Sequence, residues 1–173
     1  DASNNVIPYN TESSLQTQIK SSNNLSIVLC DDVELTNTSA IGLAKSGKNL
    51  YLNGHTLSHK QYDAHLFNYS KSTIDNFKFI GPGTIESVGS RTIFTSDSSK
   101  TDTTSKYGVV VEYVNIVTNG QLADLRIGQH KFIGCNIRHT DTSKSLFALW
   151  NKNGNMISAG VPENLLSISF DNC

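Results

Sequence analysis

A short pattern of alternating polar and apolar residues recurs along the chain, and each copy ends in a large apolar residue followed two positions later by Gly or Asn. The copies lie at residues 50–54, 77–81, 111–115, 131–134 and 167–172. Alternation with a period of two predicts β-strands, and Gly and Asn tolerate the left-handed backbone conformation of a sharp bend. Repeats at irregular spacing are typical of a solenoid whose turns carry loops of different lengths.

The chain up to residue 52 is predicted to form a helix and the first strands. Thr11 is a suitable cap for a helix from Glu12 to about Lys20, whose apolar residues Leu15 and Ile19 lie four apart. Such a helix, after an irregular arm over residues 1–10, can cover a solenoid end that would otherwise expose its core and unpaired strand edges. Predicted strands follow at residues 25–29, 33–35, 41–43 and 49–52.

After residue 52 the pattern predicts units of three strands. These strands are expected at residues 65–68, 76–79 and 84–87, at 91–95, 109–113 and 116–118, at 123–127, 130–133 and 136–139, and at 145–150 and 166–170. Bends are expected at residues 81–83, 115, 134 and 171–172. A strand, a bend and a further strand form the cross-section of a β-helix. The sequence therefore predicts an all-β protein with the fold of a right-handed, single-stranded parallel β-helix.

The predicted domain organisation is an N-terminal arm with a capping helix at residues 1–24 and the β-helix at residues 25–173. The last copy of the repeat stops within a turn of the solenoid, at residues 170–173. A solenoid that ended there would expose its core. The expectation is that the β-helix continues beyond Cys173 or that another subunit covers this end.

Stacking the copies on one another makes further predictions. The large apolar residues are expected to form one inward-facing column, consisting of Leu52, Phe79, Tyr113, Phe132 and Phe170. The residues one position earlier include Lys78, Glu112 and Lys131, which would form an outer column of alternating charge. Coincidence is the alternative interpretation of that short column. Cys135 and Cys173 would occupy equivalent positions, provided that no extra turn lies between them.

The stretch from Glu12 to His59 resembles the start of proteins of the pectin-lyase-like superfamily of right-handed parallel β-helices, and the resemblance covers most of the chain. The resemblance rests on a capping helix over residues 14–19, a strand over 26–29, and the phrase at 48–57, which is similar to the first full turn in that superfamily. The superfamily includes pectate and pectin lyases, polygalacturonases, phage tailspikes and surface adhesins. The resemblance implies the fold, and it implies a groove for polysaccharide along one outer sheet.

The first strand of each three-strand unit would line such a groove. Its polar residues are His65, Arg91, Asp124 and Arg126, and Leu125 facing inward would turn Asp124 and Arg126 outward. Arg91, Asp124, Arg126 and Trp150 are the candidate glycan-binding residues. The alternative interpretation is a set of solvated outer residues with a local Asp–Arg pair, and a Trp150 that belongs to the core.

The sequence does not decide whether the protein is an enzyme, and the weak candidates for catalytic residues are His65, Asp124 and Arg126. A lyase needs a base and a cation that holds the substrate carboxylate, whereas a hydrolase needs two carboxyl groups across the scissile bond. Asp31 and Asp32 are adjacent acids, but they lie in the first turn. The motifs of polygalacturonases are otherwise missing, so no catalytic residue is carried over. Clustered acids of the kind that hold calcium are not visible, and neither a metal nor a cofactor is expected.

Composition adds constraints on partners. The chain has 173 residues, a formal net charge of −1, and 22 Ser, 15 Thr and 18 Asn residues, which suit a β-rich surface with many turns. It shows no basic field for nucleic acid and no run of the roughly 18 apolar residues that cross a bilayer. The expected partner is a polysaccharide or cell-surface glycan, with no nucleic acid, no membrane insertion and a homotrimer as a candidate assembly.

The sequence thus favours a structural and carbohydrate-binding β-helix module, of the type found in a phage tailspike or a related virion or surface adhesin. Its expected location is extracellular or on the virion surface. The alternative is a polysaccharide lyase or glycoside hydrolase that acts on an acidic glycan.

Overall fold

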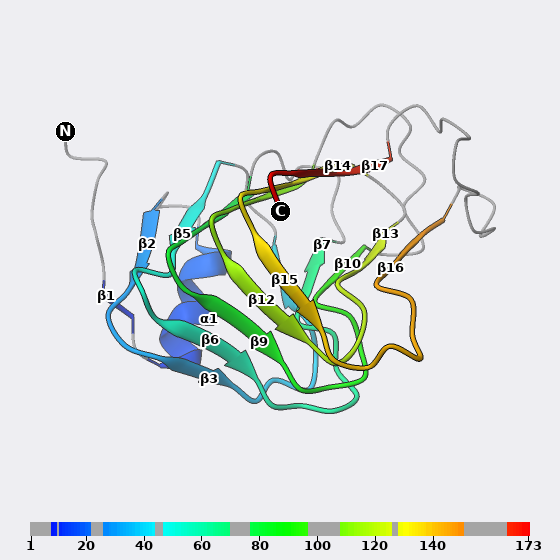
Figure 1. The fold of residues 1–173 in the computed structure, drawn as a ribbon. Helices are drawn as coiled ribbons and strands as arrows, with labels where there is room; N and C mark the ends of the chain where they lie inside the picture. Colours follow the sequence, from blue (N-terminus) through cyan, green and yellow to red (C-terminus); the bar gives the residue numbers. More distant parts are fainter. Residues whose placement is uncertain are drawn as a thin grey trace.

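The computed structural model describes residues 8–9, 11–21, 26–43, 47–69, 77–96, 108–125, 128–150 and 166–173. These residues form three parallel sheets that wind around one core (Figure 1). Sheet A has the order β1 (Pro8–Tyr9), β2 (Ser26–Leu29), β5 (Asn49–Tyr51), β8 (Phe77–Ile80), β11 (Val109–Glu112), β14 (Gln129–Ile133) and β17 (Ser167–Asp171). Every pairing in it is parallel.

Sheets B and C contain five strands each. Sheet B consists of β3 (Val33–Leu35), β6 (Thr56–His59), β9 (Thr84–Ser87), β12 (Asn115–Thr118) and β15 (Asn136–His139). Sheet C consists of β4 (Ile41–Gly42), β7 (Phe67–Tyr69), β10 (Phe94–Ser96), β13 (Ala123–Leu125) and β16 (Phe147–Leu149). The chain visits sheets A, B and C in turn and then returns to A, so one rung consists of three consecutive strands. The predicted fold class, a parallel β-helix with an N-terminal helix, is confirmed.

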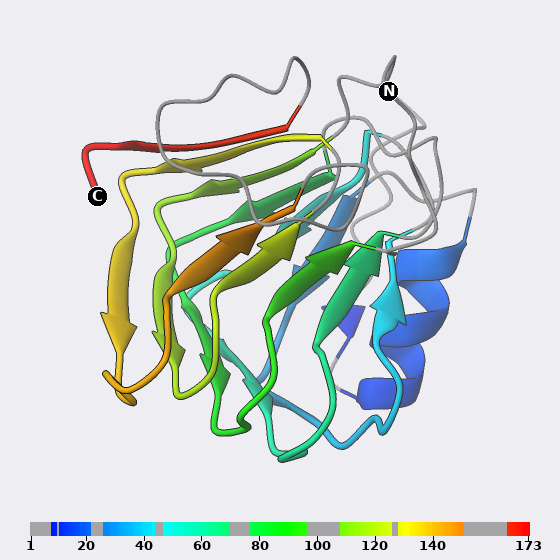
Figure 2. The same cartoon turned by 90° about the vertical axis from the view of Figure 1, so that its right-hand side faces the viewer.

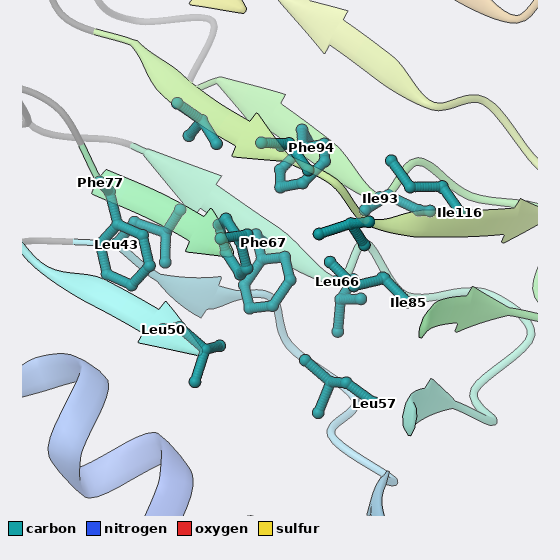
Figure 3. Packing of buried hydrophobic residues seen from close by; sticks show 14 of the residues in the cluster. Leu43, Leu50, Leu57, Leu66, Phe67, Phe77, Ile85, Ile93, Phe94 and Ile116 are labelled. Carbon is teal, nitrogen blue, oxygen red and sulfur yellow. The ribbon is translucent and has the colours of Figure 1, made fainter. Parts of the chain in front are cut away.

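The core is built from apolar residues that face inward at the same register position on successive rungs. Leu57, Ile85 and Ile116 form one such column across β6, β9 and β12, and all three are fully buried. Figure 3 shows these side chains beside Phe67 and Phe94 of sheet C. The Phe67 and Phe94 rings stack with centroids 5.7 Å apart. The stacked columns of apolar side chains thus join the three sheets into one core.

Helix α1 (Glu12–Lys20) covers the core at the first rung (Figure 2). The side chain of Thr11 accepts a hydrogen bond from the Ser14 backbone N–H, which is the predicted N-cap. Leu15 and Ile19 are completely buried in the core, as their spacing predicted. The fully buried Lys48, directly before β5, donates a hydrogen bond to the Gln18 carbonyl oxygen. This bond connects the end of the helix to the start of β5.

The predicted inward column is correct at Phe79, Phe132 and Phe170, which lie on β8, β14 and β17 of sheet A. It is wrong on the other two rungs, where the strand register places Leu50 and Val111 in the column. Leu52 is buried, but it follows β5. Tyr113 is 65% exposed.

Tyr113 itself is the bend residue of its rung, in place of the predicted Asn115. Its φ is 58°, and the residues at the same bend of the next two rungs, Gly134 and Asn172, have φ of 59° and 51°. Val111 and Val114 are both buried, so the chain has to turn between them. Burial of these two side chains overrides the preference of the left-handed conformation for Gly or Asn.

The predicted column of alternating charge is only partly correct. Lys78 Nζ lies 3.1 Å from Glu112 Oε1, so this ion pair is present. It is diagonal, because Lys78 and Lys131 both align with Val110 and Glu112 aligns with Ile80 and Ile133. Lys131 therefore does not continue a straight column.

Two strands were not predicted. Residues 8–9 form β1 at the edge of sheet A, where an irregular arm was expected. The second strand, β6, carries a buried His59 at an inward position. His59 aligns with Leu35 and with the buried Ser87, which in turn aligns with Thr118. This inward position of sheet B thus holds a polar residue on three successive strands.

The predicted equivalence of Cys135 and Cys173 is confirmed. Strand β14 pairs directly with β17, with Phe132 opposite Phe170 and Ile133 opposite Asp171. The Cys135 backbone N–H donates a hydrogen bond to Cys173 Sγ over 3.3 Å. No rung lies between the two cysteines.

Candidate functional site

The strands that were predicted to line a groove are β7, β10, β13 and β16 of sheet C. Phe67, Phe94 and Ala123 align with one another and face the core. Successive side chains of a strand point to opposite faces, so the next residues point outward. These are Asn68, Thr95 and Asp124, which align on three adjacent strands and are half-buried. They form a polar column along the outer face, with Asp124 outward as predicted.

Asn68 and Thr95 were not among the predicted candidates, which are charged or His residues together with Trp150. The signal was available in the alternation, since each follows an inward-facing Phe.

His65 and Arg91 lie in the corner before β7 and β10, not on the strands where they were predicted. Each of these strands is preceded by a buried residue, so Leu66–Phe67 and Ile93–Phe94 are consecutive inward pairs. Two consecutive inward side chains require a bend, because a regular strand would turn one of them to solvent. The strands therefore begin two or three residues later than expected.

The imidazole of His65 contacts the neighbouring rung. Its Nδ1 lies 3.3 Å from the backbone nitrogen of Thr92, which donates a hydrogen bond to it. An Nδ1 atom that accepts a hydrogen bond carries no proton, so a neutral ring has its proton on Nε2. The contact orients His65 beside Arg91, which is exposed.

Burial lowers the pKa of His65 below its ordinary value, and the nearby positive charge of Arg91 lowers it further. The carboxylate of Asp124 opposes these two effects and raises the pKa, although it is the weakest of the three. The net result is an imidazole that is neutral at pH 7. His65, Arg91 and Asp124 are thus close enough to interact electrostatically.

Two further residues, Arg126 and Trp150, were predicted to bind glycan. Arg126 lies outside the described residues, so its predicted pairing with Asp124 stays a prediction. Trp150 is half-buried, and its backbone N–H donates a hydrogen bond to the Leu125 carbonyl oxygen over 2.9 Å. The backbone of Trp150 therefore follows β16 and adjoins the end of β13. By contrast, the Phe147 ring lies 6.1 Å from that of Phe170, among the core side chains of the last rungs.

The acidic pair of the first rung is used in local contacts. Asp32 Oδ1 accepts a hydrogen bond from the Thr56 backbone N–H over 2.7 Å and lies 3.6 Å from His55 Nδ1. The pair lies immediately before β3 of sheet B, apart from the polar column of sheet C. Asp124 is the only acidic residue on the described strands of sheet C.

The described parts of the chain contain no group of three or more His, Cys, Asp or Glu residues placed to hold a metal ion. Among the same residues, no helix has the length and apolar character needed to cross a bilayer.

Comparison with known proteins gives no match: no family model, no curated protein and no solved structure matches this chain.

Proposed function

We propose that the outer face of sheet C binds a polysaccharide or cell-surface glycan and that the protein is a structural, carbohydrate-binding β-helix module. The observation that carries the proposal is the aligned column of Asn68, Thr95 and Asp124. An amide, a hydroxyl and a carboxylate repeat there at the strand spacing of about 4.8 Å. They offer donors and acceptors along one line, which suits the successive hydroxyl groups of an extended sugar chain.

The charges beside the column favour an acidic glycan. Arg91 is exposed at the corner before β10, and its guanidinium can hold a sugar carboxylate through two parallel hydrogen bonds. Arg126 and Trp150 are the proposed extension of the surface. The Arg would add a second cation, and the indole would provide an apolar face for a sugar ring.

The stacked rungs and the pattern over residues 12–59 support a place in the pectin-lyase-like superfamily. Within it we favour a phage tailspike or a related virion or surface adhesin, located outside the cell or on the virion. A homotrimer is part of this proposal. Phe147 and Phe170 are 41% and 40% exposed, and adjoining chains would cover such apolar surface. Sedimentation equilibrium should give three times the chain mass, and a monomer at every concentration would contradict the trimer.

The binding test uses the single Trp of the chain, Trp150, as a fluorescent reporter. The purified protein is titrated with polygalacturonate as the acidic probe and with dextran as the neutral one. Arg91→Gln should weaken binding of polygalacturonate by about 10-fold or more, since hydrogen bonds to charged groups contribute about 1.5–3 kcal/mol. Thr95→Ala should weaken it less, because it removes a neutral hydroxyl.

Matched controls lie on sheet B. Arg138→Gln on β15 removes an exposed Arg, and Thr84→Ala on β9 removes a half-buried Thr, both away from sheet C. These variants should bind as the unaltered protein does. Equal losses on the two sheets would indicate nonspecific attraction, and an unchanged affinity of the sheet C variants would refute the proposed surface.

The second candidate is a polysaccharide lyase or glycoside hydrolase, and the observation that favours a lyase is the neutral His65 beside Arg91. A neutral imidazole can accept a proton from the carbon next to a carboxylate, and a guanidinium can hold the charge that develops. The test follows unsaturated product by absorbance, and new reducing ends, in the presence of polygalacturonate. Turnover that His65→Gln abolishes while binding persists would place the lyase first.

A further inference from the structure

The two aligned cysteines directly follow the same bend on the last two rungs of the described chain. Cys135 follows Gly134 and Cys173 follows Asn172, and both bend residues have left-handed backbone conformations. The paired strands before them place the cysteines on adjacent rungs, about 4.8 Å apart. Disulfides span Cα separations of about 4.4–6.8 Å. The backbone is thus suitable for a bond between them without a change of register.

The sulfur of Cys173 also contacts the rung that carries Cys135. Cys173 Sγ accepts the hydrogen bond from the Cys135 N–H over 3.3 Å and donates one to the Phe132 carbonyl oxygen over 3.3 Å. Cys135 Sγ donates to the Val111 carbonyl oxygen over 3.4 Å. Each sulfur thus contacts the backbone of the preceding rung, and Cys173 Sγ lies beside the backbone of Cys135.

The two thiols differ in accessibility. Cys135 is buried, whereas Cys173 is exposed. Burial raises the pKa of the Cys135 thiol, and the neighbouring Cys173 raises it as well. An exposed thiol reaches a dissolved oxidant first, and a buried neighbour is then placed to complete the reaction.

We propose that Cys135 and Cys173 form a dithiol site that a low-molecular-weight disulfide, such as oxidised glutathione, converts to an intramolecular disulfide. The Cys173 thiolate attacks one glutathione sulfur, the glutathione S–S bond breaks, and one glutathione thiolate leaves. Cys135 then loses its proton and attacks Cys173 Sγ, which breaks the mixed disulfide and releases the second glutathione. The two protein thiols are oxidised by two electrons in all, and one glutathione disulfide is reduced to two glutathione molecules.

The disulfide would hold β17 against the preceding rung. In the reduced protein this strand is held by its pairing with β14 and by the stacked rings of Phe132 and Phe170, whose centroids lie 5.2 Å apart. A cross-link that closes a long loop disfavours the unfolded chain. We expect oxidation to raise Tm by about 5 °C or more.

The experiment equilibrates the reduced 173-residue protein in a glutathione redox buffer, quenches it with acid and alkylates the remaining thiols. Mass spectrometry of peptides prepared without reductant should show Cys135 joined to Cys173. Cys30 provides the matched control, because it is an exposed thiol outside the site. Cys30→Ser should form the same bond and show the same rise in Tm, and Cys173→Ser should show neither.

Cys135→Ser tests the order of the steps, because it should stop at the mixed disulfide of glutathione with Cys173. Circular dichroism establishes that each variant is folded before the redox measurement. Three free thiols in the unaltered protein, under conditions in which glutathione disulfide modifies a small-molecule thiol, would overturn the proposal. A bond that includes Cys30 or that joins two chains would overturn it too.

Discussion

The first and the last described rungs of the β-helix cover their core differently. At the first rung, Leu15 and Ile19 of α1 lie over the sheets, and both side chains are completely buried. At the last described rungs, Phe147 and Phe170 face the core from β16 and β17 but are 41% and 40% exposed. Phe79 and Phe170 belong to the same inward column of sheet A, yet Phe79 is 0% exposed. A side chain that points into the core of a solenoid is thus fully buried only where other residues pack against it from the rung on each side.

The largest expected effect is a difference between two identical substitutions in that column. Phe79→Ala should lower the free energy of unfolding by about 3–5 kcal/mol, because it leaves a cavity in a closed part of the core. Phe170→Ala should lower it by only about 1–2 kcal/mol, since less apolar surface is withdrawn from water there. Urea unfolding followed by circular dichroism measures both values. Equal losses would show that the exposed end is covered in solution.

The helical cap can be tested separately. Leu15→Ala should cost about 2–4 kcal/mol, because it removes buried methyl groups between α1 and the first rung. Ser13→Ala, on the exposed side of the same helix, should change stability by no more than about 0.5 kcal/mol. Comparison of the two by urea unfolding separates the loss of core contact from changes in helix propensity. A negligible effect of Leu15→Ala would mean that α1 does not stabilise the first rung.

A glycine near each end shows how local packing adds to backbone strain. Gly134 has φ of 59°, and a Cβ atom there would lie 2.6 Å from Tyr113 Cδ1. Gly47 has φ of 69° and open space around its Cβ position. Gly47→Ala should cost about 1 kcal/mol for the left-handed backbone alone, and Gly134→Ala should cost about 2 kcal/mol.

Gly134→Ala should cost more stability than Gly47→Ala because of the clash with the Tyr113 ring. This additional cost should disappear when Tyr113 is replaced by Gly, which removes the ring. A double-mutant cycle by urea unfolding measures that coupling. An excess that persists without the Tyr113 ring would place the strain elsewhere.

The smallest expected effect concerns pH. Burial lowers the pKa of His59 below the ordinary value of about 6.5, and the pKa of His65 is lowered as well. Below pH 6.5 the unfolded chain therefore binds protons that the folded protein does not, and stability falls as the pH falls. Above that pH the loss is absent.

The free energy of unfolding should fall less steeply with falling pH in His59→Leu. This variant places Leu at a position that aligns with Leu35 on the neighbouring strand. Lys60→Gln, next to it and exposed, should keep the slope of the unaltered protein. Chemical denaturation between pH 7 and pH 5 makes the comparison. An unchanged slope in His59→Leu would assign the acid sensitivity to other groups.

Local patterns predicted the elements whose signals are complete within a few residues. The helix from Glu12 to Lys20 was located by its cap and by the spacing of Leu15 and Ile19. Strands β3, β9 and β15 were found with their bounds, because polar and apolar residues alternate there. Strand β6 was missed although its four residues alternate as those of β9 and β15 do.

For the candidate site, alternation determined that Asp124 faces outward, and the same alternation places Asn68 and Thr95 on that face. It could not place His65 and Arg91 correctly, because their corner results from pairs of consecutive buried residues. The electrostatic interaction of His65 with Arg91 and Asp124 joins residues from different rungs. Which residues of different rungs lie side by side depends on the number of residues in each rung. The periodicity within a single strand carries no information about that number.

The sequence by itself thus determined the parallel β-helix, its N-terminal helix and the alignment of Cys135 with Cys173, because each follows from short-range period and equivalent position in a repeat. Only the tertiary structure decided the register at Tyr113 and the exposed fraction of Phe170. Tyr113 takes the bend because Val111 and Val114 on either side are buried. Phe170 is exposed because of its place in the stack. Both outcomes depend on contacts between rungs, and these contacts form only when residues distant in the chain pack together.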